Sequence, residues 1–278
     1  MSFHDVISRI QHMDARVVRT IMLLAIVIPL ANPLPVPLVV TANPQALYDF
    51  IEGLPVDSVV LMSNETSAGW RPNLHGTTVA VFAHLMRRGI RVVFNSFTPE
   101  GTMHSEQAIN DVAVPMGKVY GVDYVHLGYR AGGEGAVAES LRDFHATFTT
   151  DYNGTPVEEL PLMEQVRTGA DLALCVLTST GGYAGGGWVR QLVEPYGVPL
   201  AVNVTGTMAP SHYPYLDAGQ IIALMNDTKG GAEYETLIGR PGLSLSIMGA
   251  QTFSHLLILL LLAISNVAYL SRKRGDQK

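Results

Sequence analysis

Cysteine and charge are both scarce in this chain. A single cysteine, Cys175, occurs among the 278 residues, so an intrachain disulfide is excluded. The fold must then be stabilised by a hydrophobic core, for which about 200 residues suffice. Cys175 lies in the apolar sequence ALCVL with no histidine beside it, so we expect a buried, inert thiol.

Charged residues are absent from two long stretches. No Asp, Glu, Lys or Arg occurs between Arg240 and Arg272, and residues 252–271 are apolar over the length of about 20 residues that crosses a bilayer. A second uncharged stretch lies between Arg19 and Asp49, with prolines in its second half. We predict two transmembrane helices, one within residues 17–40 with a proline-rich exit and one within residues 245–271. A cleaved signal peptide is the alternative for the first stretch, although its N-terminal flank is long and mixed in charge.

The flanking charges predict the orientation. Short flanks rich in Lys and Arg stay in the cytoplasm, and such flanks occur both before the first stretch and after the second. Residues 1–16 and the basic tail 272–278 are therefore expected in the cytoplasm, and residues 41–244 form the extracytoplasmic domain of a two-pass cell-membrane protein. Residues 41–252 carry 11 basic and 21 acidic side chains, a net charge of −10. This acidity argues against nucleic acid as a partner.

The central residues alternate β-branched runs with amphipathic segments. Strands are predicted at residues 58–62, 91–94, 124–127, 172–177, 200–204 and 220–225, and helices at 45–52, 74–88, 105–116, 135–144, 187–196 and 209–217. Residues 146–168 break this alternation and are expected to lie over the sheet. Apolar strands separated by helices imply a parallel sheet covered on both faces. The predicted fold is α/β, Rossmann-like or flavodoxin-like, flanked by the two transmembrane helices.

No catalytic or metal-binding motif is recognisable. The patterns GxSxG, GxGxxG, GxxxxGK[ST] and HExxH do not occur. The acidic pairs Glu158/Glu159 and Glu233/Glu235 are expected on solvated surfaces. We therefore predict no catalytic residue, no metal site and no cofactor.

Two predicted strand-to-helix loops are rich in glycine. They cover residues 128–135 and 178–187, at the sheet edge where ligands bind in such folds. Glycine before a helix lets backbone N–H groups approach a phosphate. A ligand site here would use Asn64, Arg130, Gly132, Gly133, Ser179, Thr180, Gly181 and Gly182. The alternative is that these glycines serve tight turns and close subunit packing.

Residues 209–242, followed directly by the terminal apolar stretch, carry a resemblance to known proteins. Together with the segments LPLMEQV and YGVPLAV, this pattern resembles a family of uncharacterised prokaryotic membrane proteins that have one transmembrane helix at each end of an α/β domain. The resemblance implies architecture and a prokaryotic source. It transfers no activity and no catalytic residue.

Three functions remain open. The leading hypothesis is a non-enzymatic, membrane-anchored structural subunit that contacts membrane lipid and assembles with copies of itself or with other membrane proteins. The second is an extracytoplasmic sensor or carrier domain that binds a small anionic ligand at the carboxyl edge of the sheet. A hydrolase of unknown substrate is the third.

Overall fold

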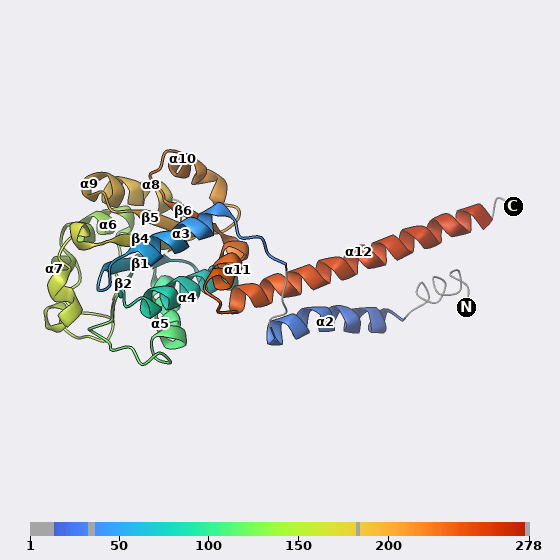
Figure 1. Ribbon diagram of the computed structural model, residues 1–278, viewed down its shortest axis with the longest axis horizontal. Helices are drawn as coiled ribbons and strands as arrows, with labels where there is room; N and C mark the ends of the chain where they lie inside the picture. Colours follow the sequence, from blue (N-terminus) through green and yellow to red (C-terminus); the bar gives the residue numbers. More distant parts are fainter. Residues whose placement is uncertain (1–13, 33–36, 182–183, 276–278) are drawn as a thin grey trace. The chain divides into compact units, whose positions relative to one another are not determined.

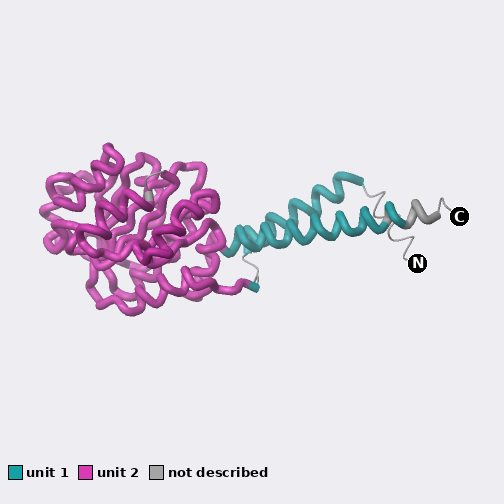
Figure 2. The backbone as a smooth tube through the Cα atoms, turned by 90° about the horizontal axis from the view of Figure 1, so that it is seen from above, with its two compact units in different colours: residues 1–37, 245–278 teal, residues 38–244 magenta. Residues whose placement is uncertain are grey.

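A computed structural model describes residues 14–32, 37–181 and 184–275. They form two compact units, residues 38–244 and residues 1–37 with 245–278 (Figure 2). The first is an α/β unit, and the described part of the second is a pair of helices. Each is described by itself below.

The α/β unit is built on six parallel strands with helices on both faces (Figure 1). The strand order is β3-β2-β1-β4-β5-β6, which is the Rossmann order and not the flavodoxin order. The strands are β1 (Val59–Glu65), β2 (Arg91–Ser96), β3 (Tyr124–Tyr129), β4 (Leu174–Ser179), β5 (Leu200–Val204) and β6 (Ala223–Asn226). The predicted parallel α/β fold is therefore confirmed.

Alternate side chains of each strand enter one of two hydrophobic cores, as the twofold period of a strand requires. On one face, Val60 and Met62 pack under α3 (Ala42–Gly53), α4 (Arg71–Arg87), α5 (Pro99–Val112) and α11 (Asp227–Leu237). On the other face, Val59 and Leu61 pack under α6 (Gly133–Arg142), α7 (Phe144–Thr147) and α8 (Ala184–Trp188). The helical path that α8 begins continues through a π turn (Val189–Val193) into α9 (Glu194–Tyr196), and α10 (Tyr213–Asp217) follows β5.

Two parts of the element prediction need comment. Residues 146–168 contribute Phe148, Val157, Leu162 and Met163 to the second core, so their predicted position over the sheet is confirmed. The sequence does not predict α11, because its few apolar residues do not form a repeat at helical spacing and it contains two glycines. The packing of α11 against α4 stabilises it instead.

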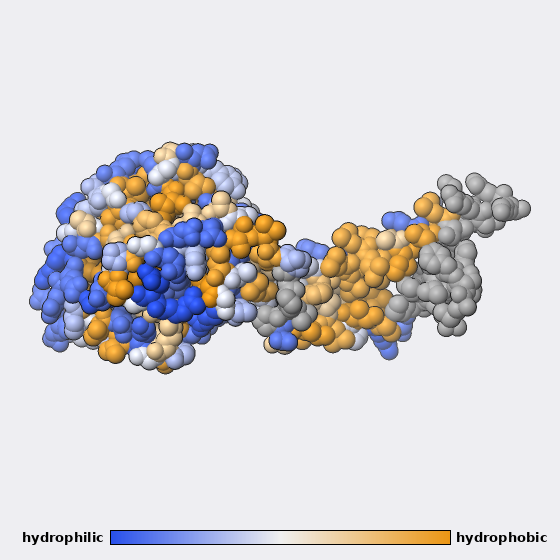
Figure 3. Space-filling view, viewed as in Figure 1, coloured by the Kyte–Doolittle hydropathy of each residue, from blue (hydrophilic) through white to orange (hydrophobic). Residues whose placement is uncertain are grey.

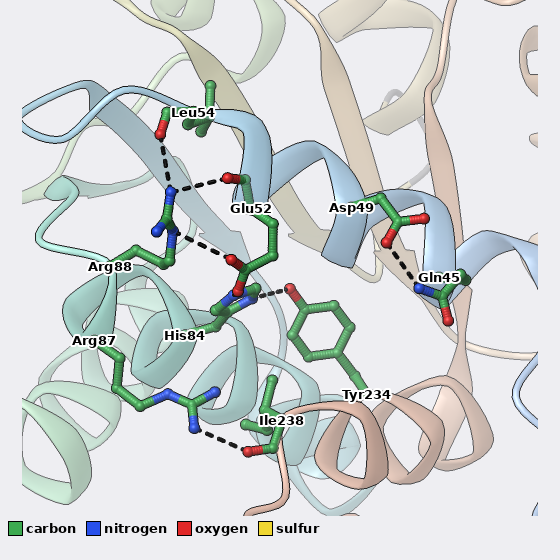
Figure 4. Close-up of polar contacts among 9 residues, drawn as sticks. All are labelled: Gln45, Asp49, Glu52, Leu54, His84, Arg87, Arg88, Tyr234 and Ile238. Atoms are coloured by element: carbon green, nitrogen blue, oxygen red, sulfur yellow. Dashed lines mark hydrogen bonds and ion pairs between the residues drawn. The ribbon is translucent and has the colours of Figure 1, made fainter.

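A buried histidine ties three helices together on the first face. His84 on α4 contacts Glu52 of α3 through Nε2 at 2.8 Å and the Tyr234 hydroxyl of α11 through Nδ1 at 2.8 Å (Figure 4). Since a carboxylate only accepts, Nε2 carries the proton and Nδ1 accepts from Tyr234. Burial lowers the pKa of His84, although Glu52 opposes that shift. Because Tyr234 is fully buried, this chain of hydrogen bonds is structural.

Two carboxylates of α11 hold the chain where it enters and leaves the α/β unit. Glu233 Oε2 accepts from the backbone N–H and hydroxyl of Thr41, at 2.8 and 2.6 Å. Glu235 accepts from the backbone N–H groups of Gly242 and Ser244, at 3.0 and 2.9 Å. Both carboxylates are buried, so their predicted place on a solvated surface is wrong; they satisfy backbone donors that have no helix or strand partner. Glu158 and Glu159 are exposed, as expected.

The helical unit contains α2 (Ala15–Ala31) and most of α12 (Leu243–Gly275). In the described part of the chain, one helix is long and apolar enough to cross a membrane, Leu243–Val267, with a mean hydropathy of 2.0. Figure 3 shows the largely apolar surface of these helices.

The predicted N-terminal span is not confirmed. With 17 residues, α2 is about 25 Å long, short of the roughly 30 Å hydrocarbon layer. Asp14 caps its start by accepting from Arg16 N–H at 2.8 Å. Asn32 ends it in an extended conformation, which the residue before a proline favours. Residues 33–36 of the predicted exit lie outside the described residues.

Candidate functional site

The carboxyl edge of the sheet has a topological switch point between β1 and β4. From β1 the chain continues to β2 and β3 on one side, and β4 starts the other side. Connections that diverge in this way leave a crevice beyond the strand ends, where ligands bind in such sheets. Both strands become polar there: β1 ends in Ser63, Asn64 and Glu65, and β4 in Thr178 and Ser179, all of them buried.

Backbone and hydroxyl contacts join the two strand ends. Thr180 N–H donates to the Glu65 carbonyl at 3.0 Å, and Ser67 N–H donates to the Thr180 hydroxyl at 3.2 Å. Ser179 Oγ accepts from Gly181 N–H at 2.9 Å and lies 3.5 Å from the Glu65 carbonyl oxygen. The structure therefore brings Ser179, Thr180 and Gly181 together beside β1. Gly182 lies outside the described residues.

Glu65 places a carboxylate inside the unit at the switch point. Its side chain is 1% exposed and accepts from Trp188 Nε1 on α8 at 2.8 Å. Asn95, which pairs with Ser63 across β1 and β2, is fully buried, and both polar atoms of its amide lack a partner in the described structure. Buried polar atoms of this kind are ordinarily hydrogen-bonded. This face of the switch point therefore has unused hydrogen-bonding capacity.

Asn64 points to the opposite face of the sheet. Its amide donates to Ser105 Oγ on α5 at 2.8 Å, while its Oδ1 is buried and, in the described structure, without a partner. Nearby, Thr66 contacts His104 Nδ1, and the rings of His104 and His75 lie 6.3 Å apart. Burial lowers the pKa of His104 to about 4, so the ring is neutral at pH 7. Asn64 thus belongs to a different polar cluster from Ser179 and Thr180.

The other glycine loop is held by β2 and reaches the π turn after α8 through an ion pair. Arg130 N–H donates to the Ser96 carbonyl at 3.0 Å, and its side chain is exposed. Gly132 and Gly133 have φ values of 132° and 54°, a region in which glycine is favoured. The neighbouring Glu134 receives Nε and Nη2 of Arg190 at 3.1 and 2.8 Å. The Arg190 hydrogen bond holds the pKa of Glu134 below its ordinary value.

A pocket that sequence reasoning missed lies where the helical path of α8 passes α10. It has a volume of about 200 Å³ and is lined by Gly185, Gly186, Gly187, Arg190, Ser211, His212 and Tyr215. The sequence marked its glycines, but the histidine comes from a segment 25 residues later. The π turn that contains Arg190 is a further signal, since such turns often occur at functional sites.

The described residues offer little support for a metal site or a reactive thiol. In residues 14–32, 37–181 and 184–275, no cluster of three or more His, Cys, Asp or Glu side chains could hold a metal ion. Cys175 is fully buried, as predicted, and burial raises the pKa of its thiol well above the ordinary value. A thiolate is therefore strongly disfavoured there.

Comparison with protein-family models, curated proteins and solved structures finds no match. The resemblance to prokaryotic membrane proteins is therefore not confirmed.

Proposed function

We propose that the α/β unit is a sensor or carrier domain that binds a small polar ligand at the switch point, and that α12 tethers it to a membrane. The carrying observation is the set of buried polar atoms without a partner in the described structure, Asn64 Oδ1 and both amide atoms of Asn95, at the carboxyl ends of β1 and β2 in the strand order whose crevice binds ligands in other proteins. Polar groups are costly to bury without partners. A ligand that supplies partners would offset that cost.

Native mass spectrometry of the full chain, released from detergent, tests this function. We expect the purified protein to retain a small molecule. Thr180→Val, which removes the hydroxyl that receives Ser67 N–H, should lower the retained fraction. The exposed Thr149→Val is the matched control and should leave it unchanged. A ligand-free wild-type chain that no small polar molecule stabilises against heat would refute the proposal.

We propose further that the α/β unit lies outside the cytoplasm. The support is the basic sequence 272–278 that follows the apolar part of α12, because short basic flanks stay inside. An impermeant maleimide should label Glu158→Cys in intact cells, since that position is exposed, whereas buried Cys175 should not react. Labelling only after lysis would contradict this orientation.

A structural role in an oligomer is the second candidate. The connection between α5 and β3 exposes four apolar side chains, Val114, Met116, Val119 and Val122. Exposed apolar patches often mark protein contacts. If this patch joins subunits, Val114→Asp with Val119→Asp should reduce the native mass to that of one chain. An unchanged mass would remove this candidate's support.

A further inference from the structure

The pocket beside α8 combines a backbone wall with three polar side chains. Gly185, Gly186 and Gly187 form the wall, and Arg190, His212 and Tyr215 face it. Its volume of about 200 Å³ is large enough for several water molecules or for a small metabolite.

The glycines let the backbone approach the polar side chains closely. A Cβ at Gly185 would lie 2.5 Å from Cδ2 and 2.8 Å from Nε2 of His212. A Cβ at Gly186 would lie 2.5 Å from the Tyr215 hydroxyl and 3.2 Å from Arg190 Nη1. A side chain at either position would therefore displace His212 or Tyr215 and reshape the pocket.

His212 presents a hydrogen-bond acceptor to this space. Its Nδ1 lies 3.0 Å from the Met208 carbonyl, which can only accept, so Nδ1 carries the proton and Nε2 has a lone pair. The residue is 3% exposed, and Nε2 is buried without a partner in the described part of the protein. A ligand hydroxyl would satisfy this atom.

Arg190 presents hydrogen-bond donors beside it. Glu134 binds the Nε and Nη2 edge of the guanidinium and so fixes its plane. The remaining nitrogen, Nη1, is the one close to Gly186. Guanidinium groups bind carboxylate and phosphate oxygens well because their donors are rigid and permanently charged.

We propose that this pocket binds a small anion that carries a hydroxyl group. The anionic oxygen accepts from Arg190 Nη1 and the Tyr215 hydroxyl, and the ligand hydroxyl donates to His212 Nε2. This inference rests on the proposed role of the α/β unit as a ligand-binding domain, and it places a ligand class and three residues at this pocket, which the switch-point residues do not line. Carboxylates and phosphates share the required chemistry.

Three small probes separate the two recognition elements. D-glycerate has an anionic group and hydroxyls, propionate has only the anionic group, and glycerol has only hydroxyls. Binding to the full chain in detergent is measured by ligand-detected NMR, with glycerol 3-phosphate in place of glycerate to distinguish phosphate from carboxylate. One well-placed hydrogen bond is worth about 1.4 kcal/mol, a factor of ten in Kd. We expect glycerate to bind about tenfold more tightly than propionate, and glycerol to bind weakest.

Single-residue variants then test which side chain binds the anionic group and which binds the hydroxyl. Arg190→Gln should weaken glycerate and propionate alike by about tenfold or more, and the exposed Arg142→Gln is its matched control. His212→Phe removes the acceptor, so the affinity for glycerate should fall to that for propionate, while the affinity for propionate should not change. Glu134→Gln removes an opposing charge and should tighten glycerate by about two- to fivefold, as expected for a partly exposed charge. Thermal unfolding of each variant checks its fold, and Arg190 is exposed enough to be replaced safely.

The outcomes separate this inference from the proposed function. If the wild-type chain retains a ligand whose binding Arg190→Gln and His212→Phe do not change, the pocket assignment is wrong and the ligand-binding function stands. If no probe binds and no ligand is retained, both fail. Equal affinity for glycerate and propionate refutes the role of His212. Glycerol binding as tightly as glycerate refutes an anionic ligand.

Discussion

The first turn of α12 joins the α/β unit at a site that only glycine permits. Ser244 is 1% exposed, and its Oγ lies between Gly76 on α4 and Gly231 on α11. A Cβ at Gly76 would lie 2.1 Å from Ser244 Oγ, 3.0 Å from Ser244 N and 3.2 Å from Glu235 Oε1. Gly76→Ala should therefore disturb the packing of Ser244 within the α/β unit.

Two opposing effects determine how much Gly76→Ala changes the free energy of unfolding. Replacing a helical glycine by alanine stabilises a helix by about 0.5–1 kcal/mol. Overpacking a close contact costs about 1–3 kcal/mol. The Ser244 hydroxyl can rotate away, whereas the backbone nitrogen cannot. We therefore expect Gly76→Ala to lower the free energy of unfolding by about 1–2 kcal/mol net.

Gly53 provides the matched control. It is the last residue of α3, whereas Gly76 lies inside α4, and a Cβ at Gly53 would meet nothing within 4 Å, so Gly53→Ala should stabilise the protein. Thermal unfolding of the full chain in detergent, followed by near-UV circular dichroism, compares the two. For a domain of this size, about 1 kcal/mol shifts Tm by about 2–4 °C.

A double-mutant cycle tests the named contact. Ser244 Oγ is buried without a partner in the described structure, so Ser244→Ala should be neutral or stabilising alone. Combined with Gly76→Ala, it should recover part of the stability lost in the single variant, with a coupling energy between the two substitutions above about 0.5 kcal/mol. Equal stability of Gly76→Ala and Gly53→Ala, or an additive cycle, would refute the contact.

The sheet was predictable because its strands are buried on both faces. Their apolar, β-branched runs differ from the helices between them, and β5 was predicted at its observed bounds. The carboxyl ends of β1, β2 and β4 were placed two or three residues early, because Asn64, Ser96 and Ser179 are polar. Those polar residues are at the candidate site. Local hydrophobicity therefore fails to predict where the strands end at the positions where function is expected.

The candidate site was predictable only in part. Glycine runs marked two loops, but pattern alone cannot show which distant side chains a loop meets. His212 reaches Gly185 because α10 follows β5, the strand beside β4. Arg190, on the π turn after those glycines, binds Glu134 of the other loop. Neither contact has a local signal, because both depend on the order of the strands.

Three further predictions concern buried groups. Glu235→Ala leaves the buried Ser244 N–H without its carboxylate and should lower the free energy of unfolding in urea by about 2–4 kcal/mol. A decrease below about 0.5 kcal/mol would show that this hydrogen bond is unimportant for stability. Cys175→Ser should cost about 1 kcal/mol and leave ligand retention intact; loss of retention in a folded variant would assign the thiol a functional role. Stability should also fall on acidification between pH 6.5 and 4. Burial lowers the pKa of both His104 and His126 from 6.5 to about 4, so within this window the unfolded chain binds protons that the folded protein does not. The neutral form of His126 is held by two contacts, since Nε2 lies 3.2 Å from the Thr102 carbonyl and Nδ1 accepts from Gly128 N–H at 3.3 Å. His126→Gln should flatten the urea-unfolding profile between pH 7.5 and 4.5 by about 1–3 kcal/mol, and a profile as steep as that of the wild type would contradict this assignment.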